Sequence, residues 1–266
     1  MESLKGAFKS ILRVTSQVCK KHDRPFHYIE DLKTGRIYCP ECEKEKVIHP
    51  RVRSMAKHVV DQEYRGYLRK YSLVNRPSVF DCTFENFKHN PGTPEDEVYK
   101  KALMLAGFYY KYPDKNGNAL FFGNAGAGKT HLAMAILNAI NEKSDNPKQK
   151  CVILSMVALI KAMRNHFNDY TANMWSQDYA EEVVKNADLV VLDDLGAESA
   201  DRQASNFVQG TLQNIYEDNQ RIITTTNLSM DELRGTYHSR LISRFLEGGR
   251  GKTIDFSKTQ DKRMWK

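Results

Sequence analysis

The segment Gly123–Thr130 constrains this 266-residue chain more than any other. Its sequence, GNAGAGKT, matches the pattern G-x-x-x-x-G-K-[ST], in which glycines let the backbone turn its N–H groups toward phosphate oxygens. An apolar stretch at 119–123 precedes the segment, and a helical pattern over 129–142 follows it. Since a helix N-terminus attracts anions, a strand, a glycine-rich loop and a helix in this order predict a phosphate-binding loop.

We expect individual residues of this loop to have distinct roles in binding the nucleotide. We expect Lys129 to reach the β- and γ-phosphates of ATP and the Thr130 hydroxyl to ligate Mg²⁺. The residues expected to line the nucleotide are Gly123, Asn124, Ala125, Gly126, Ala127, Gly128, Lys129, Thr130 and His131.

Acidic and amide side chains follow two later apolar stretches. The stretch 189–192 leads into Asp193 and Asp194, and 224–226 leads into Asn227. Because ligands of parallel sheets bind at the carboxyl ends of the strands, we expect all three side chains at the nucleotide. Asp193 would hold Mg²⁺, and Asp194 would orient or deprotonate the attacking water. Asn227 would bind the γ-phosphate or that water, or alternatively would cap the next turn.

Two arginines, Arg240 and Arg244, stand four residues apart on one predicted helical face. The planar guanidinium binds two phosphate oxygens at once and stays charged. In an oligomer, one of them could reach the γ-phosphate of a neighbouring subunit. The alternative is a pair of surface arginines.

The order of apolar and helical patterns predicts an α/β fold. Short apolar strands are expected at 119–123, 151–156, 189–192, 221–226 and 252–256, and helices at 129–142, 157–168, 203–218 and 230–246. Strands that alternate with helices and are apolar throughout form parallel sheets covered by helices on both faces.

The first third of the chain differs in charge from the rest. Residues 1–80 hold 17 of the 40 Lys and Arg residues but only 9 of the 33 Asp and Glu residues, so the excess positive charge lies there. A helix is expected over 3–18, a loop-rich region over 19–45 and a basic helix over 51–72. The sequence Asn75–Ser78 breaks this pattern, which predicts domains 1–76 and 77–266. No apolar run reaches the roughly 20 residues that span a bilayer, and no secretory signal is recognisable, so we expect a cytoplasmic protein without membrane contact.

The N-terminal region also carries two closely spaced ligand pairs. Cys19 and His22 form one pair, and Cys39 and Cys42 form the other. Two such pairs suit a tetrahedral structural Zn²⁺ site, with His27 as an alternative fourth ligand. The other reading is a set of reduced thiols in a loop.

The ordered motifs resemble those of a known family. The phosphate loop, the LVVLDDLGAE and TTTN segments and the SRLISRF helix are similar to the RecA-like core of AAA+ ATPases, specifically the DnaC/DnaI group of bacterial and phage replicative helicase loaders. The resemblance covers about residues 80–256 and includes the lead-in Thr83–Phe87. It makes Asn227 the sensor-1 residue and Arg244 the arginine finger, with Arg240 a second candidate. Asp194 departs from the usual Glu, which implies slow or partner-stimulated hydrolysis. The short sequence after Arg244 implies that the helical lid is missing.

The segment between the second and third strands is long and mixes basic with aromatic residues. Lys161, Arg164, Phe167 and Tyr170 suit stacking and phosphate contacts on single-stranded DNA. The resemblance points the same way, because loaders carry a DNA-facing helical insertion here. The alternative is that the aromatic residues pack the insertion onto the core.

These observations predict an oligomeric ATPase that converts ATP and water to ADP and phosphate and loads a hexameric replicative helicase onto single-stranded DNA. The zinc-bearing N-terminal region, with an apolar face over 3–18, would bind the helicase. Three alternatives have different partners: an ATPase that assists a transposase, as in IstB-like proteins, a P-loop phosphotransferase acting on a small molecule, and a zinc-dependent DNA adaptor with a vestigial ATPase.

Overall fold

The computed structural model describes residues 11–143, 149–199 and 203–262. The chain forms two compact units, Met1–Asp61 and Gln62–Lys266. The first unit contains the antiparallel sheet β1 (Leu12–Cys19), β2 (Phe26–Asp31) and β3 (Arg36–Tyr38), in that order. Helix α2 (Pro40–Tyr71) begins in the first unit and ends in the second.

The second unit is built on a parallel sheet of five strands in the order β5-β6-β7-β4-β8. The strands are β4 (Ala119–Phe122), β5 (Cys151–Ser155), β6 (Leu189–Leu195), β7 (Ile222–Thr226) and β8 (Thr253–Asp255). The predicted α/β class and parallel sheet are therefore confirmed. Because β4, β6 and β7 are neighbours, the segments that follow these three strands meet at one edge of the sheet.

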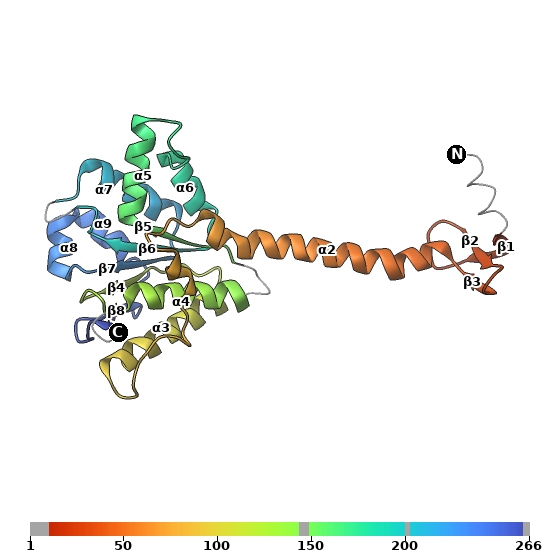
Figure 1. Ribbon diagram of the computed structural model, residues 1–266, viewed down its shortest axis with the longest axis horizontal. Helices are drawn as coiled ribbons and strands as arrows, with labels where there is room; N and C mark the ends of the chain where they lie inside the picture. The colour runs from red at the N-terminus through yellow and green to blue at the C-terminus, as the bar shows by residue number, and fades with distance from the viewer. Residues whose placement is uncertain (1–10, 144–148, 200–202, 263–266) are drawn as a thin grey trace. The chain divides into compact units, whose positions relative to one another are not determined.

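Helices cover both faces of this sheet (Figure 1). They are α3 (Pro94–Lys111), α4 (Lys129–Lys143), α5 (Met156–Asn168), α6 (Gln177–Lys185), α7 (Asn206–Asp218), α8 (Met230–Thr236) and α9 (Ser239–Phe245), with the 3₁₀ helix η1 (Pro77–Asp81) before α3. Helices α3 and α4 lie on one face, and α5, α6 and α7 lie on the other.

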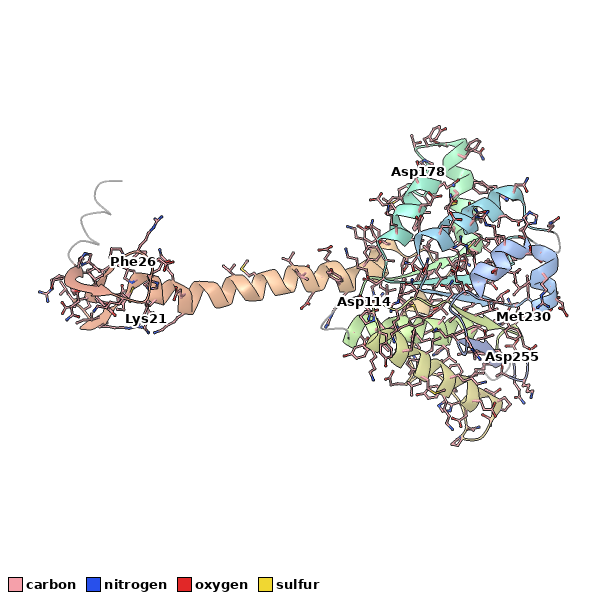
Figure 2. The ribbon with its side chains drawn as sticks, turned by 180° about the vertical axis from the view of Figure 1, so that it is seen from behind. Lys21, Phe26, Asp114, Asp178, Met230 and Asp255 are labelled. Atoms are coloured by element: carbon pink, nitrogen blue, oxygen red, sulfur yellow. The ribbon has the colours of Figure 1, made fainter. Side chains whose placement is uncertain are left out.

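Side chains from alternate strand positions fill the space between sheet and helices (Figure 2). On β5, for example, Val152 and Leu154 join the cluster under α5–α7, whereas Ile153 joins the cluster under α3 and α4. All three are fully buried. The two-residue period of a strand thus supplies both halves of the core from one apolar run, which is why the sequence of these strands shows no polar face.

The C-terminal end of α2 packs into the second unit. Tyr67 is 6% exposed, and its hydroxyl donates to the Val183 carbonyl oxygen at 2.7 Å. The next residues continue along β5, where Leu73 forms a parallel bridge with Leu154. These contacts explain why the compact units divide after Asp61, earlier than the sequence break at 75–78.

Two expectations for the N-terminal region are wrong where the structure describes it. Residues 3–10 lie outside the described residues, but Leu12–Cys19 is a strand rather than the end of a helix, paired with β2 from Leu12↔Asp31 to Cys19↔Phe26. Its β-branched residues favour a strand, and pairing with β2 overrides the helical spacing. The region 19–45 is also more regular than expected, since it contains β2, β3 and the start of α2.

Two helices lacked a prediction, α3 and α6. Both begin at a capping side chain: Thr93 accepts from the Asp96 amide, and Ser176 accepts from the Tyr179 amide. A hydroxyl residue before a helical pattern is a sequence signal for a helix start. Thr93 and Ser176 both provide this signal. Among the described residues, none of the helices combines the length and apolar character needed to cross a membrane.

Substitution of Tyr67 tests whether the end of α2 belongs to the core of the second unit. Tyr67→Ala removes a buried aromatic side chain and should lower the free energy of unfolding by about 3–5 kcal/mol. Val59→Ala, on the same helix but 65% exposed, should change it by no more than about 0.5 kcal/mol. Urea denaturation of the full chain followed by circular dichroism measures both, and equal effects would contradict this packing.

Candidate functional site

The phosphate loop Gly123–Thr130 connects β4 to α4 at the carboxyl edge of the sheet. A cavity of about 1560 Å³ opens there, lined by loop residues and by side chains from η1 to α3, from β6 and β7, and from the C-terminal segment. The predicted residues in its lining are Gly126, Gly128, Lys129, Thr130, His131, Asp193, Asp194 and Asn227. The structure therefore brings the predicted loop, acids and amide around one cavity.

Lys129 is the buried cation of this site, at 6% exposure. Its ammonium donates to the carbonyl oxygens of Gly123 and Asn124 at 2.8 and 2.7 Å, and to Asn227 Oδ1 at 2.7 Å. Asn227 in turn donates from Nδ2 to Asp194 Oδ1 at 2.8 Å. The predicted γ-phosphate residues from the loop, β6 and β7 thus form one continuous network.

Asp193 lies between two hydroxyl groups. Thr130 Oγ1 and Thr225 Oγ1 each donate to Asp193 Oδ1 at 2.7 Å. Burial raises the pKa of the Asp193 carboxyl, the two hydroxyl groups lower it, and the neighbouring Asp194 raises it further. A cation bound by Asp193 would offset both the burial and the repulsion. Thr130, Asp193 and Asp194 therefore suit Mg²⁺, a hard cation that takes oxygen ligands.

A bulge in β6 sets the direction of Asp194. The pairing of β6 with β7 shifts between Leu192 and Leu195, and Asp194 has φ of 60°, the only positive value for a non-glycine residue among those described. The Asp194 amide donates to Thr225 Oγ1 at 2.9 Å. Non-glycine residues in this conformation often occur at functional sites, where surrounding contacts hold the strain. No local pattern signals the bulge, and sequence reasoning did not assign a role to Thr225, whose hydroxyl contacts both acids.

His131 lies in the first turn of α4. Its Nε2 donates to the Thr83 carbonyl oxygen at 2.9 Å, and its ring contacts Phe87 edge to face. Burial lowers the pKa of the imidazole. The side chain thus ties the lead-in segment Thr83–Phe87 to the phosphate loop. His131 also lines the cavity, as predicted for a residue at the nucleotide.

The two arginines of α9 lie outside the lining of the described cavity. Arg240 and Arg244 each place a guanidinium nitrogen 3.5 Å from the Glu217 carboxylate on α7, and Arg244 also approaches Glu247 at 3.4 Å. Arg240 is the more exposed of the two. Both are therefore on a surface of the second unit, apart from the nucleotide cavity of their own chain.

The aromatic residues of the segment between β5 and β6 separate into two groups, and all four predicted DNA-contacting residues are exposed. Lys161, Arg164, Phe167 and Tyr170 are exposed, the last two by 77% and 74%. The other aromatic residues of this segment, Trp175 and Tyr179, pack against the core under α5–α7. The alternative of core packing thus applies to the second pair, while the first pair faces solvent at the end of α5 and just after it.

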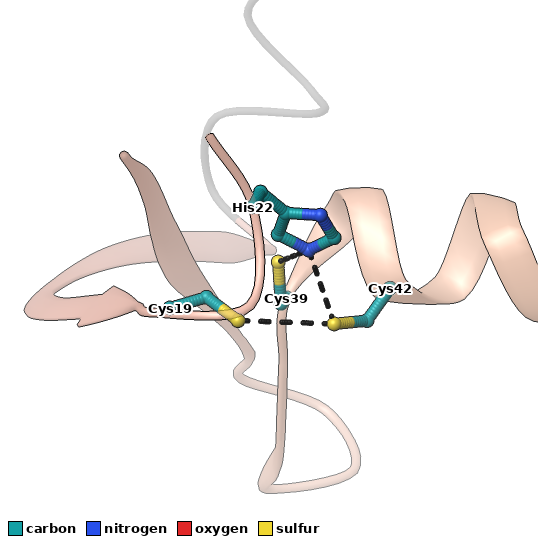
Figure 3. Close-up of side chains that lie close together, drawn as sticks. All are labelled: Cys19, His22, Cys39 and Cys42. Carbon is teal, nitrogen blue, oxygen red and sulfur yellow. Dashed lines mark hydrogen bonds between the residues drawn. The ribbon is translucent and has the colours of Figure 1, made fainter. Parts of the chain in front are cut away.

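The four predicted zinc ligands converge in the first unit, from the end of β1, the following turn, the end of β3 and the first turn of α2 (Figure 3). Their ligand atoms all lie within 4.8 Å of one another. His27 does not join them, because its Nδ1 lies 3.1 Å from the Thr15 carbonyl. Of the two histidines that the sequence left open, His22 is therefore the one that lies with the three cysteines.

Distances within this cluster fit a tetrahedral ion. Zinc–sulfur bonds of about 2.3 Å place two sulfurs about 3.8 Å apart in a tetrahedron. Cys19 Sγ and Cys42 Sγ are 3.8 Å apart, and His22 Nε2 lies 3.2 Å from Cys42 Sγ and 3.6 Å from Cys39 Sγ. The other ring nitrogen of His22 is 3.4 Å from Glu45 Oε1, as expected for the outer partner that orients a metal-bound imidazole.

The thiols of this cluster have opposite tendencies to ionise. A hydrogen bond from the Lys21 amide lowers the pKa of Cys19 to about 7, despite partial desolvation. Burial and the neighbouring thiols raise the pKa of Cys42 to about 11. Three adjacent sulfurs can therefore all be thiolates only if a cation offsets their repulsion. This donor set fits Zn²⁺.

Comparisons with known proteins agree with this geometry. The family model for the bacterial DnaA ATPase domain matches residues 80–251. The chromosomal replication initiator protein DnaA of Thermosipho africanus is 29% identical over 191 residues, which are 71% of this chain and 40% of that protein. The chain thus spans about two fifths of the length of this curated relative.

A solved structure of a DnaA protein shares the fold of the second unit. The structure of AMPPCP-bound DnaA from Aquifex aeolicus aligns with a TM-score of 0.50 at 23% identity, over 68% of this chain and 50% of that chain. The crystal structure of the DnaC helicase loader aligns with a TM-score of 0.47 at 21% identity, over 68% of this chain and 99% of that chain. The predicted AAA+ core is confirmed at the level of the DnaA-related ATPase domains.

Two variants of Asp194 test its left-handed backbone conformation. Asp194→Gly removes the steric cost of a positive φ, whereas Asp194→Ala keeps that cost, and both lose the contact with Asn227. We expect Asp194→Ala to be less stable than Asp194→Gly by about 1 kcal/mol. Chemical denaturation measures the difference, and an Ala variant as stable as the Gly variant would show that the bulge relaxes to an ordinary strand.

Proposed function

The chain belongs to the family of bacterial DnaA ATPase domains, and on that premise we propose that it binds and hydrolyses ATP with Mg²⁺ in the initiation of DNA replication. The observation that carries the proposal is the network from Lys129 through Asn227 to Asp194, beside the Thr130–Asp193 pair. It joins, in one cavity, a cation for phosphates, oxygen ligands for a metal and a carboxylate for water.

Each residue has a distinct role in the proposed reaction. Thr130 and Asp193 hold Mg²⁺, which neutralises charge on the phosphates when bound. The Lys129 ammonium exchanges its contacts with the loop carbonyls for phosphate oxygens. Asp194 orients or deprotonates the attacking water, and Asn227 positions both that water and the Asp194 carboxylate. Asp194 is one methylene shorter than Glu, so we expect slow hydrolysis that a partner stimulates.

Self-association would complete the site. Arg244 or Arg240 of one subunit would reach the γ-phosphate held by the next, in keeping with their place on a surface away from their own cavity. Within a single chain, Glu217 holds both guanidinium groups. Their 3.5 Å contacts on a solvent-facing surface are weak enough for a phosphate to replace.

The finer proposal is helicase loading. The order of the nucleotide-site motifs resembles the DnaC/DnaI group, and exposed Phe167 and Tyr170, with Lys161 and Arg164 nearby in sequence, suit single-stranded DNA. The relatives named above are replication initiators, which act in the same process. We assign the N-terminal unit, in place of the expected helix over 3–18, as the part that binds the hexameric helicase.

We also propose that a structural Zn²⁺ ion stabilises this N-terminal unit. Among the residues up to Asp61 whose burial is described, only Cys19 and Cys39 are buried. A unit with so little apolar core needs another source of stability, and a structural metal supplies it. The ligands are Cys19, His22, Cys39 and Cys42, and all four positions of the tetrahedron are filled by the protein, so the site is structural.

Metal analysis tests the zinc proposal independently of ATP. The purified full chain should contain one zinc per chain, and Cys39→Ser should lose it together with the fold of the N-terminal unit, while ATP binding persists. Cys82→Ser, at a thiol outside the cluster, should keep the zinc. Retention of full zinc content by Cys39→Ser would contradict this ligand set.

A loading assay tests the function. A ring-shaped helicase cannot thread onto closed circular single-stranded DNA, because the circle has no free end. The amount of helicase bound to such circles therefore measures loading. The full chain with ATP and the replicative helicase of its source organism should raise that amount at least tenfold. Lys129→Ala should abolish the gain, and Phe167→Ala with Tyr170→Ala should reduce it strongly.

The control for the DNA surface is Met104→Ala, an equally exposed apolar residue on α3 at 68% exposure, which should load normally. Equal loading by Lys129→Ala, or binding of a transposase in place of the helicase, would contradict the loader proposal. Phosphate transfer to a small molecule without any response to DNA would favour the phosphotransferase alternative.

A further inference from the structure

The segment that follows β8 lies against the phosphate loop. We call residues 257–262 the strap. Asn124 Nδ2 donates to the carbonyl oxygens of Ser257 and Thr259 at 2.8 and 3.2 Å, and the Lys262 amide donates to the Gly126 carbonyl oxygen at 3.1 Å. The strap is thus hydrogen-bonded to the loop near both of its ends.

Two loop glycines allow this close approach. Gly123 and Gly126 have φ of 123° and 73°. A Cβ atom at Gly123 would lie 2.6 Å from the Ser257 nitrogen, and one at Gly126 would overlap the Asp261 carboxylate. These glycines therefore make room for the strap in addition to shaping the loop for phosphates.

The last residue of the strap reaches into the nucleotide cavity. Lys262 lines it together with Gly126, Gly128 and Lys129. The Lys262 ammonium lies 3.2 Å from the centre of the Phe87 ring and donates to the Lys88 carbonyl oxygen. The same ring also contacts the phosphate loop, since a Cβ atom at Gly128 would lie 2.7 Å from Phe87 Cε2.

The charge of Lys262 is only partly compensated by the protein. Burial lowers the pKa of its ammonium to about 8, and the Glu95 carboxylate acts in the opposite direction. Glu95 itself accepts a hydrogen bond from the Gln260 amide at 2.9 Å. A partly desolvated cation that faces a phosphate-binding cavity gains most from an anionic ligand.

Four Lys and Arg side chains line the cavity, Arg76, Lys88, Lys129 and Lys262. Lys129 and Lys262 both belong to segments hydrogen-bonded within or to the phosphate loop, and they have different neighbours. Lys129 lies with Asn227 and Asp194, where the γ-phosphate is expected, whereas Lys262 lies with Phe87 and Lys88. With the γ-phosphate expected at the first group, Lys262 is the cation on the strap that could meet a phosphate nearer the ribose.

We propose that Lys262 is a nucleotide-binding residue whose ammonium contacts the α-phosphate of ATP or ADP, and that the strap forms a wall of the nucleotide site. This inference rests on the proposed binding of ATP and adds a residue that the motifs do not contain. Because the α-phosphate is common to both nucleotides, Lys262 strengthens the binding of ATP and ADP alike.

Nucleotide affinities of the full chain test the proposal. Lys262→Gln should weaken both ATP and ADP by about tenfold, the size of one charge-assisted hydrogen bond, whereas Lys262→Arg should retain most of the affinity. The matched control is Lys258→Gln, at an exposed lysine of the same strap that does not line the cavity, and it should bind both nucleotides normally. Thermal melting of each variant checks the fold.

Several results would overturn the inference. Unchanged affinity in Lys262→Gln removes Lys262 from the site, and loss of ATP but not ADP affinity moves its contact to the γ-phosphate. If Lys129→Ala abolishes binding while Lys262→Gln does not weaken it, the inference fails and the proposed function stands. If the unaltered chain binds neither nucleotide, the proposed function fails first.

A second measurement needs no substitution. Acetylation of the folded chain by acetic anhydride, read by mass spectrometry, should modify Lys262 without nucleotide and spare it with ATP or ADP, while Lys258 is modified in all cases. Equal modification of Lys262 with and without ADP would contradict the α-phosphate contact.

Discussion

The buried ammonium of Lys129 is the charge on which the arrangement of the second unit depends. At 6% exposure, it requires acceptors for its hydrogens, because a buried charge without partners is costly. The loop supplies two carbonyl oxygens, and Asn227 supplies the third acceptor. That third contact exists only because β7 lies directly beside β4 in the sheet. The strand order is therefore a condition for the site as well as for the core.

The same sheet edge explains the acids. β6 pairs with β7 on the side away from β4, so Asp193 and Asp194 arrive next to Thr225 and Asn227. The bulge after Leu192 turns Asp194 into the cavity. These side chains hydrogen-bond to one another. We infer that ATP and Mg²⁺ replace contacts that the protein already makes, which keeps the polar groups satisfied in both states.

Local pattern was sufficient to predict the parallel sheet and the phosphate loop of the second unit, because the strands are buried on both faces and the motifs are contiguous, whereas it did not predict α3 and α6. The loop Gly123–Thr130 and the pair Asp193–Asp194 are visible in a few adjacent letters. Lys262 is not, since it reaches the cavity through contacts between segments more than a hundred residues apart, such as Asn124 with Ser257. No local signal marks it. The bulge at Asp194 is likewise a product of pairing with β7.

In the first unit, the spacing of Cys and His residues predicted their clustering better than it predicted the backbone. Cys19, His22, Cys39 and Cys42 converge as their spacing suggests, yet the helix expected over 3–18 is a strand from Leu12. Pairing with β2 outweighed the weak helical periodicity. His22 lies beside Cys42, whereas His27 lies beside the Thr15 carbonyl. The direction in which each imidazole points cannot be read from its spacing to the cysteines.

We propose that the cavity at the carboxyl edge of the sheet binds ATP with Mg²⁺. Isothermal titration of the full chain with ATP, with and without Mg²⁺, tests it most directly. We predict one ATP bound per chain, with affinity that rises when Mg²⁺ is present. No heat of binding at millimolar ATP, or an affinity for ATP that Mg²⁺ leaves unchanged, would contradict the account.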